Sequence, residues 1–225
     1  MKAKQKRGDI AKLLITAVTV GALYGSVLQA KEMIWHFDNT PAGQLPAGWK
    51  SDTLNKKSDP TAWQVKEDKS SPSSRQVLAL THINHNSAAV FNICRTDKLS
   101  FLDGEIEVKF KAYRGKIDQG GGVMWRVQDR KNYYIARFNP LEDNFRLYRV
   151  KNGYRKLLST ANITLDAGKW HTMKIVQKGS RYTGYLNGKK YLEGEDGTFK
   201  KPGGVGLWTK ADAMTSFDDF SVKTK

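Results

Sequence analysis

The sequence predicts an all-β fold, a sandwich of two antiparallel sheets. Short runs of alternating apolar and polar residues recur along residues 31–225 and are separated by turn residues. This pattern is typical of strands, and no segment after residue 30 shows a persuasive helical period. Thirteen such runs are more than one sheet holds without curling, so two packed sheets are expected.

Each expected strand is bounded by residues that favour turns or loops. Asn187-Gly188 predicts a two-residue type I′ hairpin turn, because Asn-Gly suits that backbone shape, and Asn152-Gly153 predicts a second hairpin. The Ser-, Pro- and Lys-rich residues 66–75 predict a loop. The thirteen runs lie at residues 33–38, 63–66, 76–81, 88–93, 104–113, 122–128, 133–139, 145–150, 170–177, 181–186, 189–193, 204–209 and 216–222.

The first 30 residues have the pattern of a secretory signal peptide. Five basic residues flank the start of a largely apolar stretch at residues 13–28, and Gln29-Ala30 offers a small-residue cleavage point. Sixteen residues are short for a membrane-spanning helix, so cleavage is favoured over an uncleaved anchor. We therefore expect one domain at residues 31–225, exported to the periplasm or beyond and without a membrane span after cleavage.

Charge and cysteine content narrow the expected partners. Loss of residues 1–30 removes five basic residues and one acidic residue, so the formal net charge falls from +16 to +12. A basic exported protein favours acidic surroundings such as an anionic polysaccharide, although solubility alone explains the charge equally well. Nucleic acid is not expected, because no nucleic-acid motif is present. Cys94, the single cysteine, predicts a small buried side chain rather than a nucleophile.

Polar side chains suited to ligand binding alternate with apolar ones in residues 120–150. Forked guanidinium donors and flat aromatic rings together suit the hydroxyls, carboxylates and C–H faces of sugars. If the polar faces of the strands align, they form a binding groove. The alternative is that the arginines pair with acids across strands and only stabilise the sheet. The expected groove contains Arg126, Arg137, Asn139, Asn144, Arg146, Tyr148, Trp208 and Lys210.

Two acids, Glu142 and Asp143, lie in the turn between two of the arginine-bearing strands. Either is a candidate general acid or base. A neighbouring arginine lowers the pKa of a carboxyl group, however, which favours a binding role for Glu142. Turn chemistry alone also explains Asn139-Pro140 and Asp143-Asn144.

The second half of the chain carries a series of motifs that together resemble a known family. They stand at residues 118–126, 132–134, 139–144, 170–172 and 205–219 and include a Gly run before Trp-Arg, Asn-Tyr-Tyr, Trp-His-Thr and Gly-Leu-Trp-Thr-Lys-Ala-Asp. The chain resembles a bacterial family of concanavalin A-like, laminin-G-like jelly rolls often labelled 3-keto-disaccharide hydrolase-like domains. The match covers residues 99–222, whereas residues 35–95 are similar only in the placement of Phe37-Asp38 and Trp49.

The resemblance implies a concanavalin A-like jelly roll and leaves the function open, because lectins, glycosidases, lyases and spacer domains share that fold. Glycosidases of family sixteen place three carboxylates on one strand face, but Lys109 takes the third position after Glu105 and Glu107. Alginate-type lyases carry Gln-x-His, whereas here Gln128 precedes Asp129-Arg130. Both comparisons argue against those mechanisms.

Metal binding has weak support in the sequence. Jelly rolls of this class often hold one structural calcium ion through the first and last strands, which implies Asp38 and Asp218 as ligands. Capping of turns explains these acids equally well. His82 and His85 have ligand spacing only for a helix, and no third ligand is nearby. No cofactor is required by any of these features.

The favoured function is therefore a non-catalytic glycan-binding module for a hydroxyl-rich or anionic saccharide. The second hypothesis is a hydrolase of glycosidic, 3-keto-glycoside-like bonds, as the family label implies, with Glu142 or Asp143 as acid or base. A structural or adhesion domain is the third. The lack of a paired-carboxylate motif favours the first and third, and the outward Arg and aromatic residues favour the first and second.

Overall fold

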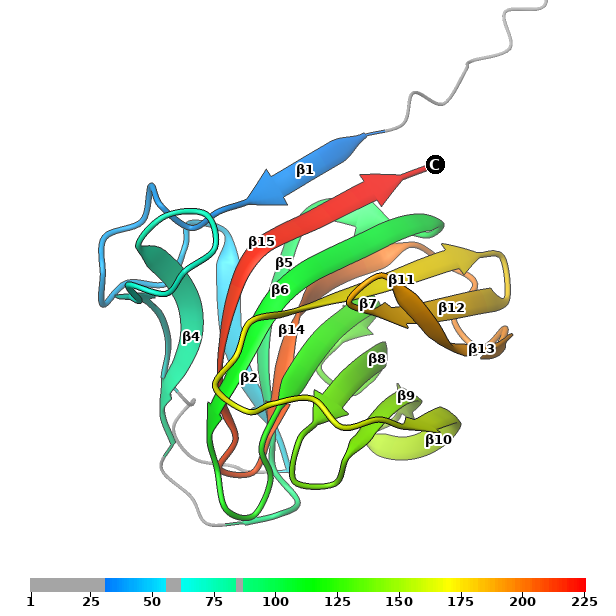
Figure 1. The fold of residues 1–225 in the computed structure, drawn as a ribbon. Helices are drawn as coiled ribbons and strands as arrows, with labels where there is room; N and C mark the ends of the chain where they lie inside the picture. Colours follow the sequence, from blue (N-terminus) through cyan, green and yellow to red (C-terminus); the bar gives the residue numbers. More distant parts are fainter. Residues whose placement is uncertain (1–30, 56–61, 84–86) are drawn as a thin grey trace, which may run out of the picture.

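The computed structural model describes residues 31–55, 62–83 and 87–225, and these form two facing antiparallel sheets without a helix (Figure 1). The predicted sandwich is confirmed. No helix in the described part of the chain is long and apolar enough to cross a membrane. The strands are β1 (Glu32–Trp35), β2 (Trp49–Leu54), β3 (Ala62–Glu67), β4 (Gln76–His82), β5 (Phe91–Phe101), β6 (Gly104–Arg114), β7 (Gly121–Asp129), β8 (Asn132–Asn139), β9 (Asn144–Lys151), β10 (Tyr154–Asn162), β11 (His171–Lys178), β12 (Arg181–Leu186), β13 (Lys189–Glu195), β14 (Gly203–Lys210) and β15 (Met214–Thr224).

One sheet, called sheet A, has the strand order β13-β12-β11-β6-β15-β4-β3. The last strand, β15, pairs with β6 along most of its length. Its first half also pairs with β4 and its second half with β1, so the first and last strands lie side by side (Figure 1). The change of neighbour coincides with a register shift after Asp218 and with a positive φ of 47° at Asp219.

The other sheet, called sheet B, has the order β10-β9-β8-β7-β14-β5-β2. Glycines at the start of β7 let it lie very close to β8. A Cβ atom added at Gly122 would collide with the carbonyl oxygen of Ala136, and one at Gly120 with that of Phe138. The Gly run that precedes Trp125 is therefore required by the backbone packing at the centre of sheet B.

Sheet B buries apolar side chains on both of its faces. The main core lies between the sheets and includes Trp125, Phe138 and Phe217. A second cluster comes only from strands of sheet B, so it lies on the face turned away from sheet A, which we call the outer face. Alternate residues of a strand point to opposite faces, which explains why neighbours such as Tyr133 and Tyr134 belong to different clusters. The outer-face cluster is Leu54, Phe91, Ile93, Met124, Val127, Tyr133, Ile135, Tyr148, Val150 and Trp208.

Both predicted Asn-Gly turns are confirmed by positive φ angles at Asn152, Gly153, Asn187 and Gly188. Cys94 is buried as expected, and burial raises the pKa of its thiol well above the ordinary value. The sequence missed β2 and β10 and placed β5 too early, because β5 starts at Phe91. The proposed signal peptide and His85 lie outside the described residues.

Candidate functional site

Polar side chains gather on the outer face of sheet B around the β8–β9 hairpin. Arg137 faces Arg146 across the hairpin, and Asn139 faces Asn144. On the other side, Arg137 is level with Gly122 of β7, which is level with Trp208 of β14. Because Gly122 has no side chain, nothing from β7 stands between the arginine and the tryptophan at this level.

Glu142 is held by three donors from this hairpin. Its Oε2 atom accepts hydrogen bonds from Arg137 Nη2 at 2.7 Å, from Asn144 Nδ2 at 3.1 Å and from Arg146 Nη1 at 3.3 Å. Burial alone would raise the pKa of Glu142, but the charges and hydrogen bonds of Arg137, Asn144 and Arg146 lower it below its ordinary value. Glu142 is therefore an ionised hydrogen-bond acceptor whose position is fixed.

A second carboxylate, Asp118, enters the same face from the loop before β7. It accepts hydrogen bonds from Asn139 Nδ2 at 3.0 Å and from Lys210 Nζ at 3.1 Å. Only 2% of Asp118 is exposed, and this burial raises its pKa against the opposing charges of Lys210 and Arg137. The pKa of Asp118 is therefore raised, whereas the pKa of the nearby Glu142 is lowered.

Aromatic rings beside these charges lie under the guanidinium of Arg155, a residue of β10. Its Cζ atom is 4.3 Å from the ring centroid of Tyr148 and 5.2 Å from that of Phe91. The rings of Phe91 and Trp208 are themselves in contact, with their centroids 5.1 Å apart. Arg155 Nη1 and Arg137 Nε are buried without a hydrogen-bond partner in the described part of the chain. Leaving a buried donor without a partner costs free energy.

These residues form what we call the outer-face site. Four cationic side chains meet two carboxylates there, so the site has an excess of positive charge. Arg137 is almost fully buried, whereas the side chains of Glu142 and Arg146 are 39% and 34% exposed. Glu142 and Arg146 can therefore be reached from solvent, and the buried Arg137 holds Glu142 in position. The outer-face site consists of Asp118, Arg137, Glu142, Arg146, Arg155 and Lys210, with the rings of Tyr148 and Trp208.

A comparison with known protein families shows which family the chain matches. Residues 37–223 match the family described as the 3-keto-alpha-glucoside-1,2-lyase-like domain. The chain belongs to this family. The family domain spans both sheets and contains every residue of the outer-face site, and the expected resemblance to a jelly-roll family with a 3-keto-sugar label is confirmed.

Individual proteins that resemble this chain have names that refer to carbohydrates. Levanase from Bacillus subtilis is 23% identical over 124 residues, which is 54% of this chain and only 17% of the levanase. The carbohydrate-binding module CBM66 from Bacillus subtilis has a TM-score of 0.60 at 18% identity, covering 79% of this chain and 96% of the module. A GH16 protein of Bacteroides ovatus, in complex with a mixed-linkage glucan product, has a TM-score of 0.58 at 11% identity, covering 85% and 99%. The family domain therefore has a jelly-roll fold also found in carbohydrate-binding modules and glycoside hydrolases.

The structure brings most of the predicted groove residues together but separates Arg126 from them. Alternation placed Arg126 on the same face as Met124. A bulge in β7, with a φ of 46° at Arg126, reverses the faces, so Val127 joins Met124 in the outer-face cluster. Arg126 instead donates to the carbonyl oxygens of Leu102, Gly179 and Phe199 and pairs with Asp103. Its expected place in the groove is corrected: it links loops away from the outer-face site.

Of the remaining predicted acids, Asp38 and Asp143 lie in turns and Asp218 lies in β15. Asp143 is exposed at a φ of 46°, and its carbonyl oxygen accepts a hydrogen bond from the amide of Ile163. Asp38 and Asp218 both reach the serine-rich loop before β4. Ser74 donates to Asp38, and Ser71 and Ser73 donate to the buried Asp218. No group of three or more His, Cys, Asp or Glu suited to a metal occurs in the described residues; calcium stays a prediction.

Sequence reasoning missed two members of the outer-face site. Asp118 is the first residue of the glycine motif on which the resemblance to the family was based, so the sequence did point to this position. Its role depends on contacts with Asn139 and Lys210. Arg155 lies on β10, which the sequence did not predict. The burial of β10 does not alternate, and for that reason no local pattern pointed to Arg155.

Proposed function

We propose that this domain binds a carbohydrate at the outer-face site. The observation that carries the proposal is the fixed arrangement of an ionised acceptor, Glu142, between the guanidinium groups of Arg137 and Arg146. A carboxylate next to forked donors matches neighbouring hydroxyl groups of a sugar, which both donate and accept hydrogen bonds. Because these side chains are already held in place, little conformational entropy is lost on binding.

The aromatic rings and the excess positive charge define the expected ligand more closely. Sugar C–H faces pack on aromatic rings, and the rings of Tyr148 and Trp208 lie directly under Arg155. A ligand either packs on the guanidinium or displaces it to reach the rings. The surplus of cationic groups favours a saccharide that is rich in hydroxyls or carries an anionic group.

Binding to a panel of neutral and anionic oligosaccharides, measured by isothermal titration calorimetry, tests the proposal. Glu142→Gln and Arg146→Gln should each weaken binding about 10-fold or more, because each removes a charge-assisted hydrogen bond. Glu67→Gln and Arg75→Gln are matched controls, since both residues are exposed and lie before β5, outside the outer-face site. A panel without any binding, or equal losses in the control variants, would overturn the proposal and favour a structural domain.

A second candidate function is cleavage of a glycosidic bond, and the oppositely shifted pKa values of Asp118 and Glu142 favour it. Such a pair provides one group that accepts and one that donates a proton. A 1,2-lyase breaks the bond from C1 to the leaving oxygen by elimination. A base removes the proton at C2, next to the 3-keto group, and an acid protonates the leaving oxygen. Glu142 would be the base and Asp118 the acid.

Incubation with a 3-keto-α-glucoside distinguishes elimination from hydrolysis. Elimination yields an unsaturated keto sugar with an ultraviolet absorption, whereas hydrolysis, the alternative from the sequence, yields the 3-keto sugar itself. Turnover should be lost in Glu142→Gln and retained in Asp143→Asn. Turnover that survives Glu142→Gln would remove Glu142 as the base.

Export is proposed as the setting for this function. The pattern of residues 1–30 supports it. Fusion of the full chain to a reporter that is active only outside the cytoplasm should give signal, and a fusion that lacks residues 1–30 should not.

A further inference from the structure

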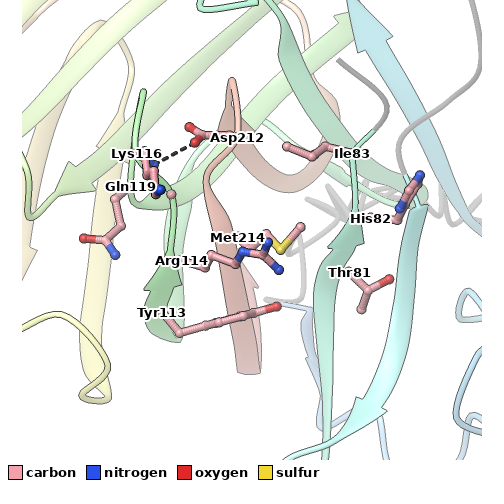
Figure 2. A pocket seen from close by; sticks show the side chains of 10 residues that line it. Thr81, His82, Ile83, Tyr113, Arg114, Lys116, Gln119, Asp212 and Met214 are labelled. Atoms are coloured by element: carbon pink, nitrogen blue, oxygen red, sulfur yellow. Dashed lines mark hydrogen bonds between the residues drawn. The ribbon is translucent and has the colours of Figure 1, made fainter. Parts of the chain in front are cut away.

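A polar pocket of about 720 Å³ lies at one end of the sandwich, apart from the outer-face site. It is lined by β4, β6 and β15 of sheet A and by the loops that follow β6 and precede β15 (Figure 2). Its size falls within the range of about 300–1,000 Å³ that is typical of small-molecule sites. We propose that this pocket binds the oxyanion group, a carboxylate or sulfate, of a charged saccharide.

The pocket contains two cationic groups that form no ion pair with a carboxylate among the residues that the structure describes. Arg114, at the end of β6, and Lys116, in the loop after it, both line the pocket (Figure 2). Neither side chain forms an ion pair with a carboxylate in the described residues. A third cation is close by, since Lys66 Nζ lies 4.3 Å from the ring centroid of Tyr113, another lining residue.

Asp212, the one carboxylate among the described lining residues, accepts its hydrogen bonds from backbone amides. Its two oxygens accept hydrogen bonds from the amides of Lys116, Ile117 and Asp118, at 2.6 to 3.1 Å. Burial opposes ionisation of Asp212, but these amide bonds lower its pKa below the ordinary value. Asp212 therefore fixes the loop, and Arg114 and Lys116 are lining cations that it does not pair with.

The loop that carries Lys116 has a defined shape before any ligand binds. Gly115 has a φ of 147°, and an added Cβ atom would collide with the carbonyl oxygen of Asp118. Met214, the strand partner of Arg114 on β15, is only 8% exposed and closes the floor of the pocket. Among the other lining residues, Gln119 offers an amide group, whereas the hydroxyl of Thr81 already donates to the carbonyl oxygen of Ala62. A guanidinium, an ammonium and an amide donor in one cleft match an oxyanion.

The pocket and the outer-face site share one loop. The amide of Asp118 contributes to the Asp212 cluster, while its carboxylate binds Lys210 in the outer-face site. A saccharide with an anionic substituent can therefore approach either side of this loop. The saccharide part of this proposal rests on the proposed function, whereas the oxyanion part rests on charged side chains that do not belong to the outer-face site.

Nuclear magnetic resonance titration of the full domain with glucose 6-sulfate, glucuronate, glucose and inorganic sulfate tests the assignment. Glucose 6-sulfate and glucuronate should shift the amide signals of residues 114–119, and glucose should not. The double variant Arg114→Gln/Lys116→Gln should bind glucose 6-sulfate at least 10-fold more weakly. Its binding of a neutral glycan at the outer-face site should be unchanged.

The matched control is Lys178→Gln/Lys223→Gln, which removes the same charge at the other end of the sandwich. Gln177 and Lys223 stand beside the start of β6, whereas Arg114 ends this strand of 11 residues, roughly 35 Å away. Equal weakening in this control would overturn the site, as would the absence of shifts with every anion at low salt. Inorganic sulfate that binds as tightly as glucose 6-sulfate would overturn the assignment to a saccharide.

Discussion

Glu142 shows how strongly neighbouring residues control one carboxyl group. Its pKa lies below the ordinary value of 4.5 in the folded protein, because Arg137, Asn144 and Arg146 together outweigh the effect of burial. A carboxyl group with a lowered folded-state pKa stabilises the fold above its unfolded pKa and loses this contribution as the pH falls. The relevant window therefore begins near pH 4.5 and extends below it.

Glu142→Gln should melt at a lower temperature than the wild type at pH 7, and this difference should shrink as the pH falls below about 4.5. Thermal unfolding followed by circular dichroism between pH 3 and pH 7 measures it. Glu67→Gln carries the same charge change without the arginine neighbours. A gap between wild type and Glu142→Gln that stays constant with pH would contradict the placement of Glu142.

Arg126 and Arg146 illustrate that two arginines of one predicted set have different roles. Arg126 is buried and donates to three carbonyl oxygens. Its removal takes this donor from the carbonyls of Leu102 and Phe199, whereas the carbonyl of Gly179 keeps a hydrogen bond from Gln177. Arg126→Met should therefore lower the free energy of unfolding by about 3 kcal/mol or more, as measured by urea denaturation. Arg146→Met should cost less than about 1 kcal/mol, since its ion pair is partly exposed.

The same two variants should differ in saccharide binding, and here Arg146→Met should show the larger effect. Folded Arg126→Met should bind like the wild type, and Arg146→Met should bind more weakly. Weaker binding by a fully folded Arg126→Met variant would show that Arg126 does contribute to the outer-face site.

Hairpin turns are the elements that the sequence predicts best. At Gly188 the φ is +79° and no atom lies within 4 Å of an added Cβ, so a substitution there meets conformational strain and no clash. Gly188→Ala should reduce the free energy of unfolding by about 1 kcal/mol, the cost of a left-handed conformation for an L-residue. Gly197→Ala, at a position without a positive φ, should have almost no effect. Equal melting temperatures for the two variants would contradict this account.

The two edge strands of sheet B are the elements that the sequence predicts worst. Both missed strands, β2 and β10, are the outermost strands of sheet B. An edge strand has only one neighbour and buries fewer side chains, so its apolar residues need not alternate. A shift in register between Leu157 and Ser159 disturbs the pattern of β10 further. Arg155 was missed for this reason, although it covers the aromatic rings of the outer-face site.

Calcium is a prediction at the scale of the whole molecule, because its ligands would come from both ends of the chain. Asp38 follows β1, Asp218 lies in β15, and both contact the loop of Ser71, Ser73 and Ser74. Oxygen ligands of this kind suit calcium. Calcium should raise the melting temperature, a chelator should lower it, and Asp218→Asn should abolish the difference. A melting temperature that does not respond to either reagent would leave the serines as simple caps.

Local patterns in the sequence determined the sandwich, both Asn-Gly hairpins, the buried Cys94 and the shared face of Arg137, Arg146 and Tyr148. Each depends on the period of two in a strand or on the backbone preference of a turn, which neighbouring residues set. Tertiary structure alone decided that the bulge in β7 removes Arg126 from this face. It also brought Asp118 and Arg155 to the outer-face site, and Arg114 to the polar pocket at one end of the sandwich. Those contacts depend on the order of strands in each sheet, and long-range pairing leaves no mark in the local pattern.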